Sequence, residues 1–379
     1  MVMSLLPFRV EFSQRAIADL HRRIDQTRWP EISIGSGWDT GTDDATLRDL
    51  ARYWRTEYDW SEQQERLNEL AHVRGLIDGE ELHSVLYTGK GSSKRVPLLL
   101  IHGWPGSFLE FIDASPRLVA DTGSGPGFDV VIPSLPGFGF SEAPKSPGMH
   151  PGLIAERLHG LMKELGYDRY GVQGGDWGAV IGTALAQEHP ESVLGLHINF
   201  MTGGTLVPGS DLSDEEVAYH ARLKELRATE TGYSKIQSTR PQTLAYALQD
   251  SPIGLLAWIL EKFWGWSDHG EDLWSTIDRD WLLTNVMLYW LTGSVLSASR
   301  IYYEMRQIGP VIGKKPVTIP TAYARFPGEP WNAPRAIAER QYRLVRMTEP
   351  ARGGHFAALE QPELFAEDVS TFFNTLSSE

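Results

Sequence analysis

Cysteine is absent from all 379 residues of the sequence. This absence excludes a disulfide framework, a thiolate zinc site, a cysteine nucleophile and a thiol redox switch. Long apolar runs are also absent, because none approaches the roughly 20 residues that cross a bilayer. The richest run, Ile253 to Trp266, is interrupted by Glu261 and Lys262. Positive charge is scarce, with 35 Lys and Arg against 49 Asp and Glu, and the net charge of −14 argues against nucleic acid or an anionic membrane as the main partner.

The beginning of the chain, Met1 to Arg9, has too short an apolar run for a signal peptide. We therefore expect a soluble, cytoplasmic protein. Tryptophan is plentiful, with 13 residues, in a chain that is 41% hydrophobic and 22% charged. This composition is typical of a globular protein with a large core. Six tryptophans cluster late in the chain, where we expect most to pack together and a few to line a pocket: Trp258, Trp264, Trp266, Trp274, Trp281 and Trp290.

The first 90 residues or so contain two predicted helices. One follows Ser13 as its N-cap and ends at Trp29-Pro30, and the other runs from about Ala45 to Arg55. From Val96 onward, apolar runs alternate with helical segments, which predicts a doubly wound, mostly parallel sheet. The predicted strands are 96–101, 129–132, 170–173, 193–198, 316–321 and 342–347.

Between the fourth and fifth of these strands, the segment from about 200 to 312 is helical and aromatic. A helical insertion in an α/β sheet is expected to act as a lid over the strand ends that hold the chemistry. We therefore expect an α/β fold in four parts. These are an N-terminal extension (1–92), the first part of the core (93–200), the lid (201–312) and the second part of the core (313–379).

The segment Gly174-Gly175-Asp176-Trp177-Gly178 lies between a predicted strand and a predicted helix. Small residues two positions before and two after the central residue are typical of a nucleophile elbow, a sharp and strained turn. Here the central residue is an aspartate. A carboxylate nucleophile attacks an sp³ carbon and forms an alkyl ester, which water then cleaves. This chemistry suits epoxides and alkyl halides rather than esters or peptides.

The segment from His102 to Gly106 directly follows the strand 96–101. In a fold with this elbow, such a segment supplies one backbone N–H to the oxyanion hole. We expect the two donors to be the amides of Trp104 and Trp177. We expect His102 to have a structural role, which is to orient this loop.

The base and its acidic partner should follow the later strands. Among the 11 histidines, only His355 lies after the last predicted strand, where it can deprotonate the attacking water. Glu329 follows the strand 316–321 and is the candidate that orients the imidazole. Its nearest rivals, Glu339 and Glu349, have the pattern of ordinary solvated charges.

Opening an epoxide creates an alkoxide, which needs a proton or a strong hydrogen-bond donor. Tyrosine hydroxyls suit this task because they donate without carrying a charge. A halide leaving group would instead need Trp or Asn N–H donors. Periodicity alone does not choose among the lid tyrosines, which are Tyr219, Tyr233, Tyr246, Tyr289, Tyr302 and Tyr303.

Taken together, these motifs resemble those of the α/β-hydrolase-fold epoxide hydrolases, in the microsomal-type branch that carries an N-terminal extension. The resemblance covers nearly the whole chain. In the core it rests on segments 102–107, 136–141, 174–178 and 352–356. In the extension and the lid it rests on segments 25–30, 53–54, 58–60, 232–233, 236–237, 239–241, 250–255 and 283–290.

The resemblance implies a role for each matching residue. Asp176 would be the nucleophile, His355 the base and Glu329 its acidic partner. Tyr233 would be the first ring-opening tyrosine and Tyr302 the second. Tyr303, about 100° around the same helix, is the rival for the second position.

The resemblance also implies conversion of an apolar epoxide, aryl or bulky, to a vicinal diol, without a metal or an organic cofactor. Animal enzymes of this branch carry an N-terminal membrane anchor, which we expect this protein to lack. Members of the family often form homodimers, and some soluble members act in natural-product pathways, including enediyne biosynthesis. From these properties we also expect a homodimer and a bulky epoxide substrate that belongs to one biosynthetic pathway.

Two other functions are considered. A haloalkane dehalogenase would use the same Asp–His pair, and Trp177 would suit a halide, but Trp104 stands where many dehalogenases have asparagine. A hydrolase fold can also serve as a non-catalytic binding protein. The complete set of Asp176, Glu329 and His355 argues against that function.

Overall fold

The computed structural model describes residues 5–31, 37–89, 95–120, 127–202 and 212–376. Within these residues, the centre is a nine-stranded sheet of order β1-β2-β3-β5-β4-β6-β7-β8-β9. The six strands from β5 to β9 in this order pair in parallel, and β1, β2 and β3 extend the sheet in antiparallel fashion. The strands are β1 (Leu5–Pro7), β2 (Ala71–Ile77), β3 (Glu80–Tyr87), β4 (Arg95–Ile101), β5 (Gly127–Pro133), β6 (Tyr170–Gly174), β7 (Val193–Ile198), β8 (Val317–Ala324) and β9 (Tyr342–Thr348).

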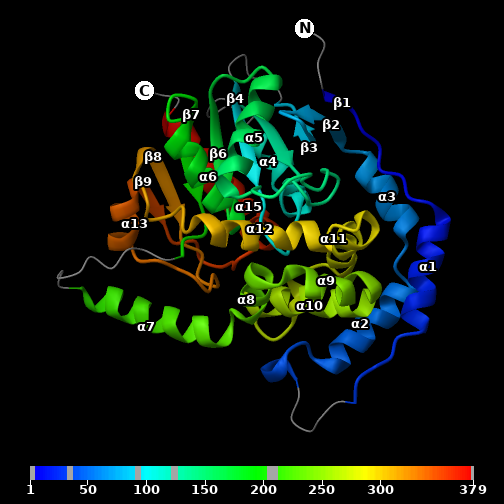
Figure 1. Cartoon of the computed structure of the whole chain (residues 1–379). Helices are drawn as coiled ribbons and strands as arrows, with labels where there is room; N and C mark the ends of the chain where they lie inside the picture. The colour runs from blue at the N-terminus through cyan, green and yellow to red at the C-terminus, as the bar shows by residue number, and fades with distance from the viewer. Residues whose placement is uncertain (1–4, 32–36, 90–94, 121–126, 203–211, 377–379) are drawn as a thin grey trace.

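Helices cover both faces of the sheet (Figure 1). On one face, α6 packs against β4, β6, β7 and β8, and α5 packs against α6. On the other, α15 packs against β7 and against α4, which lies on β5. The predicted doubly wound, mostly parallel α/β fold is confirmed. These helices, with three others of the core, are η2 (Phe108–Phe111), α4 (Ser115–Leu118), α5 (Pro151–Glu164), α6 (Trp177–Glu188), α13 (Arg335–Gln341), α14 (Ala357–Glu360) and α15 (Pro362–Leu376).

The helices between β7 and β8 form a separate layer below the sheet in Figure 1. Helix α12 packs on α8 and α9, and α10 packs on α9 and α11. Side chains of α11 fix the loop after β4, because Asn285 Nδ2 donates to Pro105 O (2.8 Å) and Tyr289 Oη donates to Gly106 O (2.7 Å). The helices of this layer are α7 (Asp214–Thr229), α8 (Gly232–Thr239), α9 (Pro241–Asp250), α10 (Pro252–Trp266), η3 (Leu273–Ser275), α11 (Arg279–Thr292) and α12 (Val295–Ile308).

The N-terminal residues join the sheet to this helical layer. Strands β1 and β2 extend one sheet edge, α1 and α2 pack against α10, and α3 packs against α11. Three side-chain contacts support this packing. Arg23 Nη1 donates to Asp250 O (2.7 Å), Thr42 Oγ1 donates to Ala257 O (2.7 Å), and the rings of Trp38 and Trp264 stack at 4.3 Å. The helices are α1 (Gln14–Asp25), η1 (Trp38–Thr40), α2 (Asp44–Thr56) and α3 (Trp60–Asn68).

Ser13 does cap α1, since its side chain accepts from the amide of Ala16. The predicted end of that helix at Trp29-Pro30 is wrong, because the helix stops at Asp25. The Thr27 hydroxyl binds the carbonyl of Arg23 and so takes the place of the next helical amide. Strands β1 and β2 and helix α3 were not predicted.

The boundary at 92/93 falls within residues 90–94, which lie outside the described residues. In the part of the chain that the structure describes, no helix combines the length and apolarity needed to cross a membrane.

Candidate active site

Asp176 occupies the turn between β6 and α6 with φ 48° and ψ −124°. A non-glycine residue at positive φ is strained and is held only where its surroundings require it. Gly174 and Gly178, on either side of Asp176, cannot carry a side chain because neighbouring backbone atoms lie too close. A Cβ on Gly174 would lie 2.2 Å from the carbonyl of Gly178, and a Cβ on Gly178 would lie 1.8 Å from Ile101 O. The turn therefore holds the carboxylate above the N-terminus of α6, at the carboxyl edge of the parallel strands.

Two backbone amides converge on this carboxylate. The Trp104 amide donates to Asp176 Oδ1 at 2.9 Å, and the Trp177 amide lies close enough to the same side chain to lower its pKa. The approach is close enough that a Cβ on Gly103 would lie 2.2 Å from Oδ1. The loop after β4 and the start of α6 therefore place the two amides named from the sequence beside Asp176, and their role as an oxyanion hole stays a prediction.

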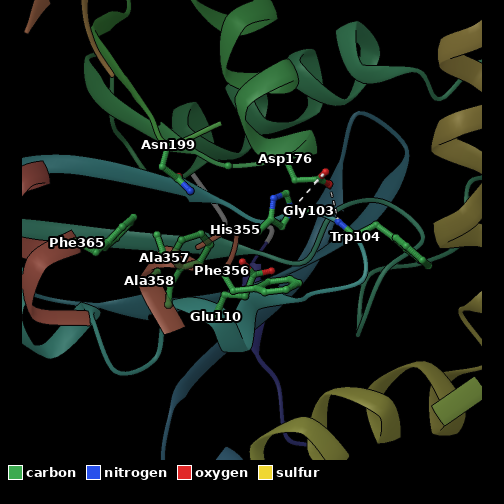
Figure 2. Close-up of a pocket in the computed structure, with 12 residues that line it drawn as sticks. Gly103, Trp104, Glu110, Asp176, Asn199, His355, Phe356, Ala357, Ala358 and Phe365 are labelled. Atoms are coloured by element: carbon green, nitrogen blue, oxygen red, sulfur yellow. Dashed lines mark hydrogen bonds and ion pairs between the residues drawn. The ribbon is translucent and has the colours of Figure 1, made fainter. Parts of the chain in front are cut away.

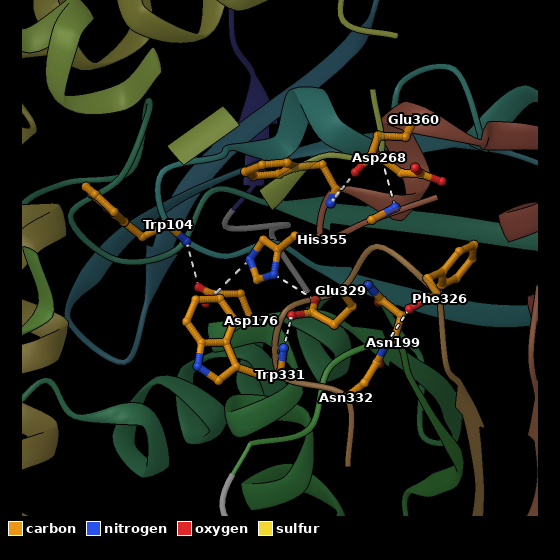
Figure 3. Close-up of polar contacts among 12 residues, drawn as sticks. Trp104, Asp176, Asn199, Asp268, Phe326, Glu329, Trp331, Asn332, His355 and Glu360 are labelled. Carbon is orange, nitrogen blue, oxygen red and sulfur yellow. Dashed lines mark hydrogen bonds and ion pairs between the residues drawn. The ribbon is translucent and has the colours of Figure 1, made fainter. Parts of the chain in front are cut away.

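His355 lies between two carboxylates (Figure 3). Its Nε2 is 3.7 Å from Asp176 Oδ2, and its Nδ1 is 2.7 Å from Glu329 Oε2. Glu329 is fully buried, and its other oxygen accepts from the amide of Trp331 at 3.0 Å. Because a carboxylate accepts at Nδ1, that nitrogen carries a proton and Nε2 faces Asp176. The structure thus brings the three residues named from the sequence into one chain of contacts.

The charges of these groups depend on one another. Burial alone would lower the pKa of His355, but Glu329, and after it Asp176, raise this pKa to about 9. Burial raises the pKa of Asp176, whereas His355 and the two backbone amides oppose the rise. The histidine therefore rests as an imidazolium that compensates the buried negative charge on either side of it.

The rival acids lie elsewhere. Glu339 and Glu349 pair with surface arginines, and their side chains are 51% and 69% exposed. His102 is buried, and its Nε2 accepts from the amide of Leu135 at 3.2 Å. Its Nδ1 therefore carries the proton and donates to Gly103 O at 2.9 Å. Burial lowers the pKa of His102 to about 4, so this residue holds the loop as a neutral ring.

Two lid tyrosines meet the core at this site. The ring of Tyr233, on α8, stacks on Trp104 with centroids 5.0 Å apart. The ring of Tyr302, on α12, stands edge-on to Trp177 at 4.7 Å and to Tyr233 at 5.8 Å. The buried hydroxyl of Tyr302 has the side chains of Tyr233 and Trp177 as polar neighbours, but no hydrogen bond of good geometry among the described residues. Burial and the charge of Asp176 raise the pKa of both tyrosines, which keeps their hydroxyls protonated.

The other tyrosines have different surroundings. Tyr303 lies against the guanidinium of Arg300 at 5.7 Å, and no ring contact among the described residues joins it to Trp104 or Tyr233. Tyr289 binds the carbonyl of Gly106, and Tyr246 is 72% exposed. Geometry therefore favours Tyr302 over Tyr303.

Two polar residues of the site were not identified from the sequence. Glu110 and Asn199 line a small cavity beside Asp176 and His355 (Figure 2). A signal existed for each. Glu110 is an acid inside the apolar helix η2, and Asn199 is a polar residue directly after a buried parallel strand. Polar groups at the carboxyl ends of such strands are typical of functional sites.

Two family models match the chain. The one described as "alpha/beta hydrolase fold" covers residues 96–202, and the one described as "Epoxide hydrolase N terminus" covers residues 5–111. With the sheet order and the strained turn at Asp176, the first match defines the class of the protein. It is an α/β-hydrolase-fold enzyme with an aspartate at the elbow.

Full-length relatives narrow this class. Epoxide hydrolase 1 of Sus scrofa is 37% identical over 99% of this chain and 90% of its own. Juvenile hormone epoxide hydrolase from the silkworm Bombyx mori has a similar crystal structure, with a TM-score of 0.92, 35% identity, and coverage of 99% of this chain and 95% of that one. The structure of Aspergillus niger epoxide hydrolase gives a TM-score of 0.87 and 29% identity, with coverage of 98% and 96%.

The chain therefore belongs to the epoxide hydrolases, in the branch of the microsomal and juvenile hormone enzymes, as its motifs predicted. Membership of this family favours epoxide hydrolysis over haloalkane dehalogenation and over a non-catalytic binding role.

Proposed function

We propose that this epoxide hydrolase acts through an alkyl ester on Asp176, which is hydrolysed by water that His355 activates. One observation carries the proposal. The side chain of Asp176 stands at a strained turn between two backbone amides and the imidazole of His355. A carboxylate without a nucleophilic role would not require this backbone strain.

In the first half-reaction, the hydroxyls of Tyr233 and Tyr302 bind the epoxide oxygen. An oxygen of Asp176 attacks a ring carbon, the C–O bond of the ring breaks, and a tyrosine gives its proton to the alkoxide. Both tyrosines support this step because burial keeps them protonated and the hydroxyl of Tyr302 has no satisfactory partner among the described residues.

Ester formation removes the negative charge of Asp176, which is one of the groups that raise the pKa of His355, so the imidazolium gives its Nε2 proton to the tyrosinate left by ring opening. In the second half-reaction, water attacks the carbonyl carbon of the ester and gives a proton to Nε2 of the now neutral His355. Glu329 holds the imidazole in the required tautomer. The oxyanion is stabilised by the amides of Trp104 and Trp177. The ester bond breaks, the diol oxygen takes the proton from His355, and the proton left on Asp176 returns to His355, which restores the resting carboxylate and imidazolium.

We propose an apolar substrate, either aryl or bulky. Aromatic rings gather on the lid side of Asp176, where Tyr233 contacts Trp104 and Trp266, and Tyr302 contacts Trp177. A panel of aryl and alkyl epoxides, with chiral analysis of the diols, tests this class. A role in natural-product biosynthesis stays a prediction, and a bulky enediyne-type epoxide belongs in the panel.

The division into extension, core, lid and core is likewise proposed. It is supported by the helices that stand between the end of β7 at Ile198 and the start of β8 at Val317. The homodimer predicted from the resemblance can be checked by light scattering on the purified protein.

Single-turnover hydrolysis in ¹⁸O-labelled water tests the covalent mechanism. With enzyme in excess over styrene oxide, the first diol should carry unlabelled oxygen, because Asp176 supplies it. Labelled diol in the first turnover would exclude the ester. In a second experiment, His355→Gln should accumulate the ester, seen as a mass increase on Asp176. His220→Gln, on the lid helix α7, is the control and should turn over normally.

A further inference from the structure

A small cavity lies beside Asp176 on the core side of the site (Figure 2). The residues that line it come from η2, α14, α15 and the loops after β4, β6, β7 and β9, and none comes from the lid helices. The space that it offers to the centre of a water-sized sphere is about 10 Å³. One water molecule needs roughly 10–15 Å³ on this measure, together with two to four polar partners. The cavity therefore has the size of a single-water site.

The polar groups on its wall match the needs of one water molecule. Asn199 Oδ1 accepts from Gln173 Nε2 at 2.8 Å, which leaves the amide nitrogen of Asn199 as a donor. Figure 2 shows this nitrogen turned toward the cavity. His355 Nε2 faces Asp176, and the carboxylate of Glu110 lies near the same imidazole. Once Asp176 is esterified and its charge is lost, neutral His355 and ionised Glu110 become acceptors, so the wall then offers one donor and two acceptors around the carboxyl carbon of Asp176.

Backbone contacts fix the position of Glu110. The backbone amides of Gly103 and Ser107, in the loop after β4, lie close enough to its carboxylate to lower its pKa. A Cβ on Gly106 would lie 1.6 Å from Glu110 Oε1, so the loop packs directly on the carboxylate. The acid is therefore held on the cavity wall by the same loop that presents the Trp104 amide to Asp176.

The charge of Glu110 is linked to the state of Asp176. Loss of solvent raises the pKa of Glu110 to about 8, and the negative charge of Asp176 adds to this rise, while His355 opposes it. Esterification removes the charge of Asp176. The ester state therefore favours the ionised form of Glu110, which can accept a hydrogen bond from water.

We propose that this cavity holds the hydrolytic water and that Glu110 is the residue that positions it. The inference rests on the covalent mechanism proposed above. The amide nitrogen of Asn199 donates to the water oxygen, and the two water hydrogens point to Nε2 of His355 and to Glu110. The water oxygen bonds to Cγ of the esterified Asp176, one proton passes to His355, and the other stays on the new hydroxyl and is donated to Glu110. Glu110 acts only in this second half-reaction.

Transient kinetics on the full-length enzyme with styrene oxide separate the two half-reactions. The nearby indoles of Trp104 and Trp177 report ester formation by fluorescence, and intact-protein mass measures the ester directly. Glu110→Gln keeps an oxygen for the backbone amides but removes the charge. We expect ester formation within about twofold of the parent and ester hydrolysis slowed by about 10- to 100-fold, within the range for a positioned proton-transfer group. Asp113→Asn, an exposed acid three residues away, is the matched control and should change neither rate.

The outcomes are distinct. If Glu110→Gln slows both half-reactions equally, Glu110 only supports the oxyanion loop and the proposal is overturned. The proposal is also overturned if neither rate changes. Glu110→Asp, which keeps the charge, should recover part of the hydrolysis rate and serves if the glutamine variant does not fold. An unmodified enzyme that forms no ester with styrene oxide would contradict the covalent mechanism itself, not the role of Glu110.

Discussion

The two sides of the site are built by different means. On the core side, turns that follow strands carry Asp176, Glu329 and His355, and charge and backbone hydrogen bonds fix each side chain. On the lid side, helices carry Tyr233 and Tyr302, and ring packing fixes them. The core side therefore holds buried charged groups close together, whereas the lid side presents neutral hydroxyls whose placement depends on how the lid packs.

The largest expected effect comes from removing the central carboxylate of the core side. Asp176→Ala should lower kcat by at least about 10⁴-fold, as loss of a covalent nucleophile does. Because burial raises the pKa of Asp176, its charge opposes folding, and the variant should be at least as stable as the parent. Activity on styrene oxide and urea unfolding measure the two effects. A variant that is both active and less stable would show that Asp176 is structural.

Stability should depend on pH through the core side. The folded pKa of His355, about 9, is above its ordinary value of 6.5, so its contribution is complete below pH 6.5 and is lost as the pH rises through 9. A shift of this size corresponds to about 3 kcal/mol. The raised pKa of Glu110 acts in the same direction. Urea unfolding between pH 6 and 10 should show the fall, and His355→Gln should flatten most of it. Equal slopes in parent and variant would contradict the charged His355.

On the lid side, the hydroxyls themselves can be removed without changing the packing. Tyr233→Phe and Tyr302→Phe should each slow ester formation by about 10²-fold, at the lower end of the range for a general acid. Ester hydrolysis should change little, because it depends on the core side. Tyr303→Phe is the control, since that ring lies against Arg300. A large loss in Tyr303→Phe with normal Tyr302→Phe would reverse the assignment.

The same contrast explains which parts of the site could be predicted from the sequence. The positions on the core side were predictable because a strained turn needs glycines at fixed spacing, and because the residues proposed as base and acid follow particular strands of this fold. The packing of the lid could not be predicted from periodicity, since six tyrosines shared its helices. The choice of Tyr302 over Tyr303 depends on rings from α8 and α6 that meet it only in three dimensions.

Other features were missed for physical reasons. Strand β1 has only three residues, which is too few to show the alternation of apolar and polar residues that predicts a strand. It is a strand because β2 pairs with it. Glu110 was overlooked because one acid in an apolar helix resembles a surface residue until the fold places it beside His355. The end of α1 was misplaced because Pro30 is an obvious stop, whereas the Thr27 hydroxyl already ends the helix.

The smallest expected effect concerns the N-terminal extension that holds the lid. Tyr58, which precedes α3, shares a buried hydrogen bond of 3.0 Å with Thr284 on α11. Tyr58→Phe should lower the free energy of unfolding by about 1 kcal/mol, the typical net value of such a bond, and leave the rate of ester formation nearly unchanged. Tyr246→Phe, on a 72% exposed ring, is the matched control and should change neither quantity. Tyr58→Phe could instead slow ester formation as much as Tyr302→Phe does. That result would show that the extension also positions the ring-opening tyrosines, because helix α11 would transmit the change from Thr284 to the site.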